Sequence, residues 1–201
     1  MKLLYTGNSP YARRARISVR EAGLLAQTEE LDLTPREEHE ATLLEHGPGG
    51  KVPVLVTDDG LSLCESLIIN RYLDDLSGGG RLYPANAQDR ALTYSIEATA
   101  SVLLDSLFVR SREKRRPANE RSPGVISLEA TRAARCLDLL EANGASLGGR
   151  VDCGVFTVVV ALGYANWRHP EDRWQDGRPT LAKCYETLMQ RSAVAETAPV
   201  F

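Results

Sequence analysis

Residues 2–12 read Lys-Leu-Leu-Tyr-Thr-Gly-Asn-Ser-Pro-Tyr-Ala, a short apolar run followed by a small polar loop and a helix start. The run Lys2–Thr6 predicts a strand. Ser9 is a preferred N-cap residue, and Pro10 suits the first helical position, where its missing N–H is not needed. Gly23 ends the predicted helix. A strand that passes directly into a helix is typical of an α/β domain.

The chain continues this pattern to about residue 76. The predicted elements are a strand over Thr28–Leu33, a helical segment from the capping-box-like Thr34-Pro35-Arg36-Glu37 to about His46, antiparallel strands over Val52–Thr57 and Leu61–Cys64 joined by a tight turn at Asp59-Gly60, and a helix over Ser66 to about Leu76. Strand–helix–strand followed by a hairpin and a helix is the order of the thioredoxin fold.

Composition changes at Ser77-Gly78-Gly79-Gly80, a flexible run of glycines, and no strand signal follows it. Helical periodicity then predicts three helices, over Gln88 to about Arg112, Leu128–Ala142 and Val155–Trp167. The last contains an apolar run too short to span a bilayer, which predicts a buried central helix. The fold class is therefore α/β plus all-α: a thioredoxin-like N-terminal domain (1–77), a linker (78–87) and a C-terminal α-helical bundle domain (88–201).

Composition describes an ordinary soluble protein of 201 residues with a formal net charge of -3 and no basic arm, so nucleic acid and membrane are not expected partners. The N-terminus lacks the pattern of a signal peptide, which makes the cytoplasm the expected location. The cysteines and histidines are scattered without metal-ligand or disulfide spacing, so we expect structural thiols and no metal site. These residues are Cys64, Cys136, Cys153, Cys184, His39, His46 and His169.

The motif Ser9-Pro10-Tyr11-Ala12 resembles the Cys-Pro-Tyr-Cys redox motif of glutaredoxins with both sulfurs removed. Serine and alanine cannot carry out thiol–disulfide exchange, so dithiol redox chemistry at this motif is excluded. What remains is an anion-binding helix start with a hydroxyl aimed at it, which can hold the thiolate of a bound thiol.

Further segments extend the resemblance over almost the whole chain, and the chain resembles the bacterial cytosolic glutathione transferases. The matching segments are Ser9 to Arg16, Pro48-Gly49-Gly50-Lys51-Val52-Pro53-Val54-Leu55, Glu65-Ser66, Arg112-Glu113 with Arg116-Pro117, Ala161-Leu162-Gly163-Tyr164, Arg178-Pro179 and Thr197-Ala198-Pro199. The resemblance implies glutathione as cosubstrate, a homodimer, and a role in detoxification. The sequence contains no phosphate-loop, flavin or nicotinamide motif, so we expect no further cofactor.

The resemblance also implies a role for each residue of a glutathione site. A cis Pro53 would let the Val52 backbone pair with the cysteinyl unit of glutathione, as an edge strand does. Ser66 would take the γ-glutamyl carboxylate at a helix N-terminus, and Glu65 would face its ammonium group. Lys51 would pair with the glycyl carboxylate, or is a solvated lysine beside a strand.

Ser9 has two interpretations. It is the catalytic hydroxyl that stabilises the glutathione thiolate and lowers the thiol pKa, or it is only a helix cap. Tyr5, at the end of the first strand, is a possible second hydroxyl or a packing residue. Arg13, Arg14 and Arg16 add positive potential near this helix start or form a solvated face, and for most of them we expect the solvated face.

The family position predicts an acceptor pocket in the helical domain, built from Val102, Leu103, Ser106, Phe108, Val109 and Tyr164. One departure from the family concerns the buried helix, which relatives begin with a Ser/Thr-x-x-Asp capping box. Here Asp152 takes the cap position and Val155 replaces the aspartate, so half of the reciprocal cap is missing. The sequence therefore predicts a weakened helix start that Val155→Asp would strengthen.

The sequence favours a glutathione transferase that transfers the thiolate sulfur held by Ser9 to a small hydrophobic electrophile. Two alternatives stay open. One is a glutathione-dependent isomerase or dehalogenase-like enzyme, which regenerates the thiolate. The other is a non-catalytic interaction protein that kept the fold, against which the intact Val52-Pro53 and Glu65-Ser66 segments argue.

Overall fold

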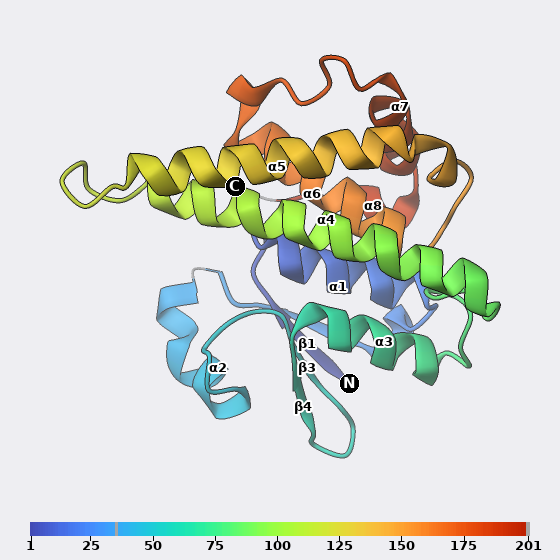
Figure 1. Ribbon diagram of the computed structural model, residues 1–201. Coiled ribbons are helices and arrows are strands. Elements are labelled where there is room, and N and C mark those ends of the chain that lie inside the picture. The colour runs from blue at the N-terminus through green and yellow to red at the C-terminus, as the bar shows by residue number, and fades with distance from the viewer. Residues whose placement is uncertain (35, 200–201) are drawn as a thin grey trace. The chain divides into compact units, whose positions relative to one another are not determined.

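The computed structural model describes residues 1–34 and 36–199, and the chain divides into two compact units (Figure 1). The first unit joins Met1–Arg90 with the segment that begins at Arg191, and the second is Ala91–Gln190. The sequence predicted domain limits of 1–77 and 88–201. In the structure the segment from Arg191 onward belongs to the first compact unit and not to the helical one. The predicted capping box at Thr34–Glu37 includes Pro35, which lies outside the described residues.

The first unit is a thioredoxin-like α/β unit, as the order of elements predicts. It contains β1 (Lys2–Tyr5), α1 (Pro10–Glu21), the 3-10 turns η1 (Leu25–Gln27) and η2 (Arg36–His39), β2 (Glu29–Asp32), α2 (Glu40–His46), β3 (Val54–Val56), β4 (Ser62–Cys64), α3 (Ser66–Leu76) and α8 (Ser192–Ala195). The strands form one sheet in the order β2-β1-β3-β4, in which β1 runs parallel to β2 and antiparallel to β3, and β4 runs antiparallel to β3.

Alternation along β1 and β3 gives the sheet two apolar faces. Leu4 and Val54 are paired across the strands and pack with Leu43 of α2 in one cluster. Leu3 and Leu55, the neighbouring pair, are fully buried and point to the opposite face. The helices α1 and α3 pack against each other beside the sheet (Figure 1). Both faces are therefore covered, as expected for a sheet with a parallel pair.

Local sequence signals set the ends of α1. The Ser9 Oγ accepts a hydrogen bond from the Ala12 N–H at 3.2 Å, and Pro10 is the first helical residue. After the helix, Gly23 takes a φ of +74°, and the Leu24 N–H donates to the Val19 carbonyl at 2.9 Å. This is a Schellman motif, whose left-handed residue glycine adopts without strain.

The hairpin between β3 and β4 differs from the predicted two-residue turn. The Gly60 N–H donates to the Thr57 carbonyl and the Thr57 N–H donates to the Leu61 carbonyl, so three residues form the connection. Gly60 has a φ of +87°, which is the left-handed position of a type I turn with a bulge. Asp59-Gly60 lies in the turn as predicted, but the residues that pair across the loop are Thr57 and Leu61, so Asp58 belongs to the loop as well.

The glycine run after α3 is hydrogen-bonded rather than free. Asp74 is buried, and its carboxylate accepts from the N–H groups of Gly80, Arg81 and Leu82 at 3.3, 3.0 and 2.7 Å. Gly79 donates to the Asp74 carbonyl at 2.8 Å. One carboxylate thus holds the loop that we expected to be flexible.

The second unit is helical in its described residues. It contains most of α4 (Ala87–Lys114), then α5 (Pro123–Ala142), η3 (Gly144–Ser146), α6 (Cys153–Arg168), η4 (Pro170–Asp172) and α7 (Pro179–Met189). Each residue from Cys153 to Ala165 is buried, which confirms the predicted buried helix. By length and composition α4 is apolar enough to cross a membrane, but core helices of soluble proteins pass the same test, so this is weak evidence.

The buried helix α6 is capped as the sequence predicts. Asp152 Oδ1 accepts from the Val155 N–H at 3.3 Å. Its second oxygen accepts from the Arg150 Nε at 2.7 Å and from the Thr93 hydroxyl at 3.1 Å. No sequence pattern indicates these two partners, which together with the Val155 N–H engage both oxygens of the cap carboxylate.

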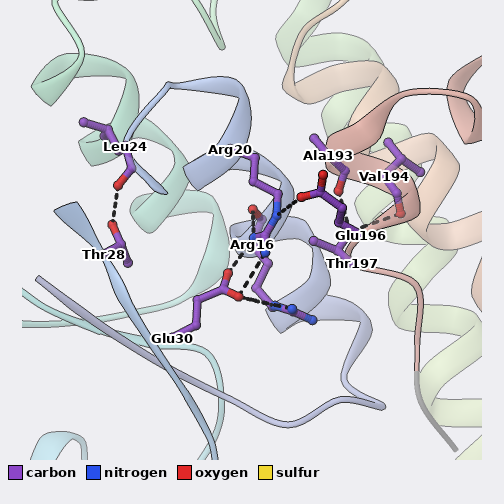
Figure 2. Close-up of polar contacts among 9 residues, drawn as sticks. All are labelled: Arg16, Arg20, Leu24, Thr28, Glu30, Ala193, Val194, Glu196 and Thr197. Atoms are coloured by element: carbon purple, nitrogen blue, oxygen red, sulfur yellow. Dashed lines mark hydrogen bonds and ion pairs between the residues drawn. The ribbon is translucent and has the colours of Figure 1, made fainter. Parts of the chain in front are cut away.

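The segment from Arg191 completes the first unit. Arg191 pairs with Glu21 at 2.8 Å, Glu196 pairs with Arg20 at 3.2 Å, and the Val194 carbonyl accepts from the buried Arg13 at 3.1 Å. Figure 2 shows Arg16 and Arg20 converging on Glu30 of β2, with Glu196 on the other side of Arg20. These ion pairs tie α1 both to the sheet and to α8.

Candidate functional site

The strand register brings three predicted site segments to one edge of the sheet. Leu4 near the end of β1 pairs with Val54 at the start of β3, and Val54 pairs with Cys64 at the end of β4. The chain segments that leave β1, enter β3 and leave β4 therefore lie at the same edge. These segments carry Ser9, Val52-Pro53 and Glu65-Ser66 respectively.

Ser9 lies half-buried at the N-terminus of α1. Its Oγ accepts from Ala12, so one lone pair is used for the cap. Its hydroxyl donates to no group among the described residues, which leaves the proton for an external acceptor. The cap and a role toward a ligand thiolate are thus compatible.

The Val52–Pro53 peptide bond is cis, as the resemblance implied. Val52 is half-buried and Pro53 is buried. The loop before them is anchored, because the Arg36 guanidinium donates to the Gly50 carbonyl at 2.6 Å. Lys51 is exposed and reaches solvent beside this segment.

Glu65 and Ser66 form the start of α3. Glu65 is exposed and has a φ of +75°, which is unusual for a residue with a side chain. Such conformations cluster at functional sites. The Ser66 hydroxyl is buried and lies 3.4 Å from the Glu65 carboxylate. An acidic group and a hydroxyl thus share a helix N-terminus, where the positive end of the dipole favours an anion.

Arg14 connects the two helix starts and was missed as a site residue. Its guanidinium donates to the Ser66 Oγ at 2.6 Å, and both residues are buried, with 2% and 1% of their surface exposed. Arg13 is also buried, so the predicted solvated arginine face is wrong for both. Arg16 is mostly buried as well, in an ion pair with Glu30. Periodicity could have flagged Arg14, because it lies on the same helix face as buried apolar residues.

Tyr5 packs under a guanidinium. The Arg16 side chain lies 4.2 Å from the centre of the Tyr5 ring. Burial raises the pKa of the Tyr5 hydroxyl, while the charge of Arg16 opposes this rise. The hydroxyl therefore stays protonated at neutral pH and can act as a donor but not as a base. This contact supports the packing interpretation of Tyr5.

The predicted acceptor-pocket residues lie on different faces of their helices in the second unit. Val102 and Val109 are exposed on α4, whereas Leu103 and Ser106 are buried. Phe108 and Tyr164 are brought together, with ring centres 6.4 Å apart. Of the six predicted residues, Phe108 and Tyr164 are therefore the pair for which the structure shows a ring–ring contact.

The residues that the structure describes contain no group of three metal-binding side chains. Their four cysteines are free thiols, and burial raises the pKa of Cys136 and Cys184. A depressed thiol pKa, which a reactive cysteine needs, is thus not indicated for those two. The chemistry that the sheet edge can supply is anion binding and hydrogen bonding by hydroxyl, guanidinium and backbone groups.

Comparisons with known proteins agree with this arrangement. Residues 8–76 match the family model "Glutathione S-transferase, N-terminal domain". An uncharacterized GST-like protein of Escherichia coli K12, YibF, is 30% identical over 99% of this chain and 98% of its own length. The chain belongs to the glutathione transferase family.

Two solved structures are similar over nearly the whole chain. A glutathione S-transferase from Methylobacillus flagellatus with glutathione bound has a TM-score of 0.91 at 28% identity, covering 99% of each chain. A family member from Pseudomonas fluorescens Pf-5 with bound S-(propanoic acid)-glutathione has a TM-score of 0.87 at 28% identity, covering 100% of each chain.

Proposed function

We propose that this protein binds glutathione at the sheet edge of its first unit and transfers the thiolate sulfur to a small hydrophobic electrophile. The observation that carries the proposal is the convergence of Ser9, the cis Val52–Pro53 segment and Glu65-Ser66 at one edge of the sheet. Each of these groups matches a different part of a tripeptide thiol.

In this proposal the carboxylate and the ammonium group of the γ-glutamyl unit bind to different residues. The Ser66 hydroxyl and the start of α3 take the γ-glutamyl carboxylate, and Glu65 takes the ammonium group. The Val52 backbone pairs with the cysteinyl unit, and Lys51 pairs with the glycyl carboxylate. The sulfur then lies at the start of α1, where the Ser9 hydroxyl donates to it.

Ser9 acts as a hydrogen-bond donor and not as a nucleophile. A donor that bonds the thiolate better than the thiol lowers the thiol pKa, which is ~8.5 in water. More of the bound glutathione is then nucleophilic at neutral pH. The bound adduct in the Pseudomonas structure is a glutathione with a substituent on sulfur, which supports sulfur transfer for this chain too. A homodimer in the cytoplasm and a role in detoxification belong to the same proposal.

The test compares wild type with Ser9→Ala by calorimetric titration of glutathione and by ultraviolet absorbance of the bound thiolate across pH. We expect both proteins to bind, with the thiolate pKa in the variant higher by ~1 unit. The matched control is Ser122→Ala, because Ser122 also caps a helix that begins with proline, and accepts from Val125 at 3.3 Å. Both variants lose about 1 kcal/mol of cap energy.

The outcomes separate the alternatives. Equal thiolate curves in wild type and Ser9→Ala would reduce Ser9 to a cap. No binding to wild type would contradict the proposal and favour an interaction protein. Product analysis separates a conjugating enzyme, which consumes glutathione, from an isomerase, which regenerates it.

A further inference from the structure

A stripe of buried polar residues runs along one face of α3. Ser66, Asn70 and Asp74 follow one another at intervals of four residues, so their side chains lie on the same face of the helix. Their exposed fractions are 1%, 0% and 6%. Each of these polar groups is removed from water and therefore needs hydrogen bonds inside the protein.

The two ends of this stripe have partners. The Ser66 Oγ accepts from the Arg14 guanidinium at 2.6 Å. The Asp74 carboxylate accepts from three backbone N–H groups of the loop that follows α3, at 3.3, 3.0 and 2.7 Å. Asn70, in the middle, has no hydrogen-bond partner for its Nδ2 or its Oδ1 among the residues that the structure describes. A desolvated amide in this condition destabilises the folded state, so a further partner is expected.

The helix α1 packs against α3 and runs in the same direction (Figure 1). The helices meet near their starts, where Arg14 contacts the first residue of α3, and again beyond their ends, where Arg81 donates to the Ala22 carbonyl at 3.1 Å. Ser18 lies one turn after Arg14 on the same face of α1, and its exposed fraction is 0%. The parallel course therefore brings Ser18 to the level of Asn70.

We propose that Asn70 and Ser18 hold an internal water molecule between α1 and α3, and that this water positions the Arg14 guanidinium for the γ-glutamyl group of glutathione. The inference rests on the proposed function and adds Asn70 to it as a positioning residue. A water molecule donates and accepts at once, so it serves an amide and a hydroxyl together. Internal waters typically make about three hydrogen bonds to buried polar groups.

The position of this water explains why a fully buried amide acts on the ligand site. The water lies one helical turn from the contact between Arg14 and Ser66. In a buried polar network each hydrogen bond orients the next, so the water fixes the spacing of α1 and α3 where both helices face the γ-glutamyl carboxylate. Loss of the water lets the two helices move together, and Arg14 then loses its direction toward Ser66.

The first experiment detects the water itself. In a heteronuclear Overhauser experiment on the full chain, with and without glutathione, a long-lived water should transfer magnetisation to the side-chain amide protons of Asn70. These signals are assigned by their disappearance in Asn70→Leu. Bulk solvent does not reach this amide, since Asn70 is fully buried. A spectrum of wild type without such transfer would overturn the proposal, whether or not glutathione binds.

The second experiment tests the positioning role. Asn70→Leu keeps the branched shape of the side chain and removes both polar atoms. Calorimetric titration should show glutathione binding weakened about fivefold, whereas cysteinylglycine, which lacks the γ-glutamyl unit, should bind as it does to wild type. Ser18→Ala should have the same effect, and the double variant should lose no more than Asn70→Leu alone, because both substitutions remove the same water.

Thr28→Val is the matched control. Thr28 is a buried residue of the same unit, and its hydroxyl donates to the Leu24 carbonyl at 2.9 Å (Figure 2). This substitution also exchanges a buried polar group for an apolar one of similar shape. It should leave the binding of both ligands unchanged.

The outcomes distinguish the inference from the proposed function. Unchanged glutathione binding and higher stability in urea for Asn70→Leu would overturn the positioning role, because apolar replacement of a merely unpaired group is neutral or stabilising. Equal weakening for both ligands would overturn it as well. Failure of wild type to bind glutathione would contradict the proposed function, while transfer from water to Asn70 would still support the internal water site.

Discussion

Arg14 donates to the Ser66 oxygen over 2.6 Å, and the Ser66 hydroxyl in turn donates to the Glu65 carboxylate at 3.4 Å. A buried guanidinium thus orients a hydroxyl that we assign to the γ-glutamyl carboxylate. It also adds a positive charge beside that carboxylate, in surroundings where charges interact strongly. Arg14 is therefore a positioning residue of the proposed site.

Arg14→Lys should weaken glutathione binding about tenfold, because a lysine cannot reproduce the directed contact to Ser66. Cysteinylglycine, which lacks the γ-glutamyl unit, should bind the variant and wild type alike. Calorimetric titration of both ligands checks this. Arg16→Lys is the matched control, since Arg16 pairs with Glu30 and not with α3. Equal weakening for both ligands would indicate general damage instead of a positioning role.

The local geometry of the proposed site was predicted from the sequence better than its surroundings. Ser9, Pro53, Glu65 and Ser66 belong to short motifs whose local geometry follows from helix starts and a strand entry. Arg14 was placed wrongly because its burial depends on α3, which is some fifty residues away in the sequence. Local patterns do not contain such a partner.

At the scale of elements, the start of α6 is where sequence and structure predict opposite effects. The missing half of the capping box suggests that Val155→Asp stabilises the helix. However, Val155 is fully buried, and the Asp152 carboxylate already holds Arg150, Thr93 and the Val155 N–H. A second carboxylate in this turn has no cation of its own.

Val155→Asp should therefore destabilise the protein by about 3 kcal/mol, through lost apolar burial and an unpaired buried charge. Urea unfolding followed by tryptophan fluorescence measures this. Val155→Asn serves as the uncharged comparison and should cost less. A higher stability of Val155→Asp would show that the new carboxylate reaches the Asp152 N–H and completes the box.

Elements with strong end signals were predicted well. The helix α3 has the predicted limits, Ser66 to Leu76. It begins directly after the strand that ends at Cys64, and its apolar residues recur at helical spacing up to Leu76. The helix α5 begins at Pro123, five residues before the predicted Leu128, although Ser122-Pro123 carries the same start signal as Ser9-Pro10. The helices α7 and α8 were not predicted, because they are short and their stability comes from packing and ion pairs.

At the scale of the whole molecule, the buried His169 and the partly buried Glu30 give the two units different acid sensitivities. Burial holds the pKa of His169 below 6.5, with Arg110 and Lys114 lowering it further. Burial raises the pKa of Glu30, but hydrogen bonds from Arg20 and Arg16 outweigh this and hold it below 4.5. Each group binds its proton more readily in the unfolded chain. Each contribution to stability is complete above the unfolded pKa and is lost as the pH falls through the folded pKa.

The second unit should therefore lose stability first as the pH falls. Both tryptophans, Trp167 and Trp174, lie in that unit and report on it. We expect the urea midpoint from tryptophan fluorescence to fall between about pH 7.5 and about pH 5, and His169→Gln to lessen this fall. Hydrogen exchange of α1 amides, which reports on the first unit, should weaken only at lower pH. An unchanged fall in His169→Gln would contradict the assignment.

The return of the chain to α1 has a consequence for synthesis on the ribosome. Arg13 donates to Val194, and Arg20 and Glu21 pair with Glu196 and Arg191. The whole second unit is translated between these partners. At about 5–20 residues per second, the nascent first unit waits on the order of 5–20 s for them. Throughout this interval the Arg13 guanidinium lacks its contact to the Val194 carbonyl. The first unit therefore begins to emerge from the ribosome before the second but is completed after it.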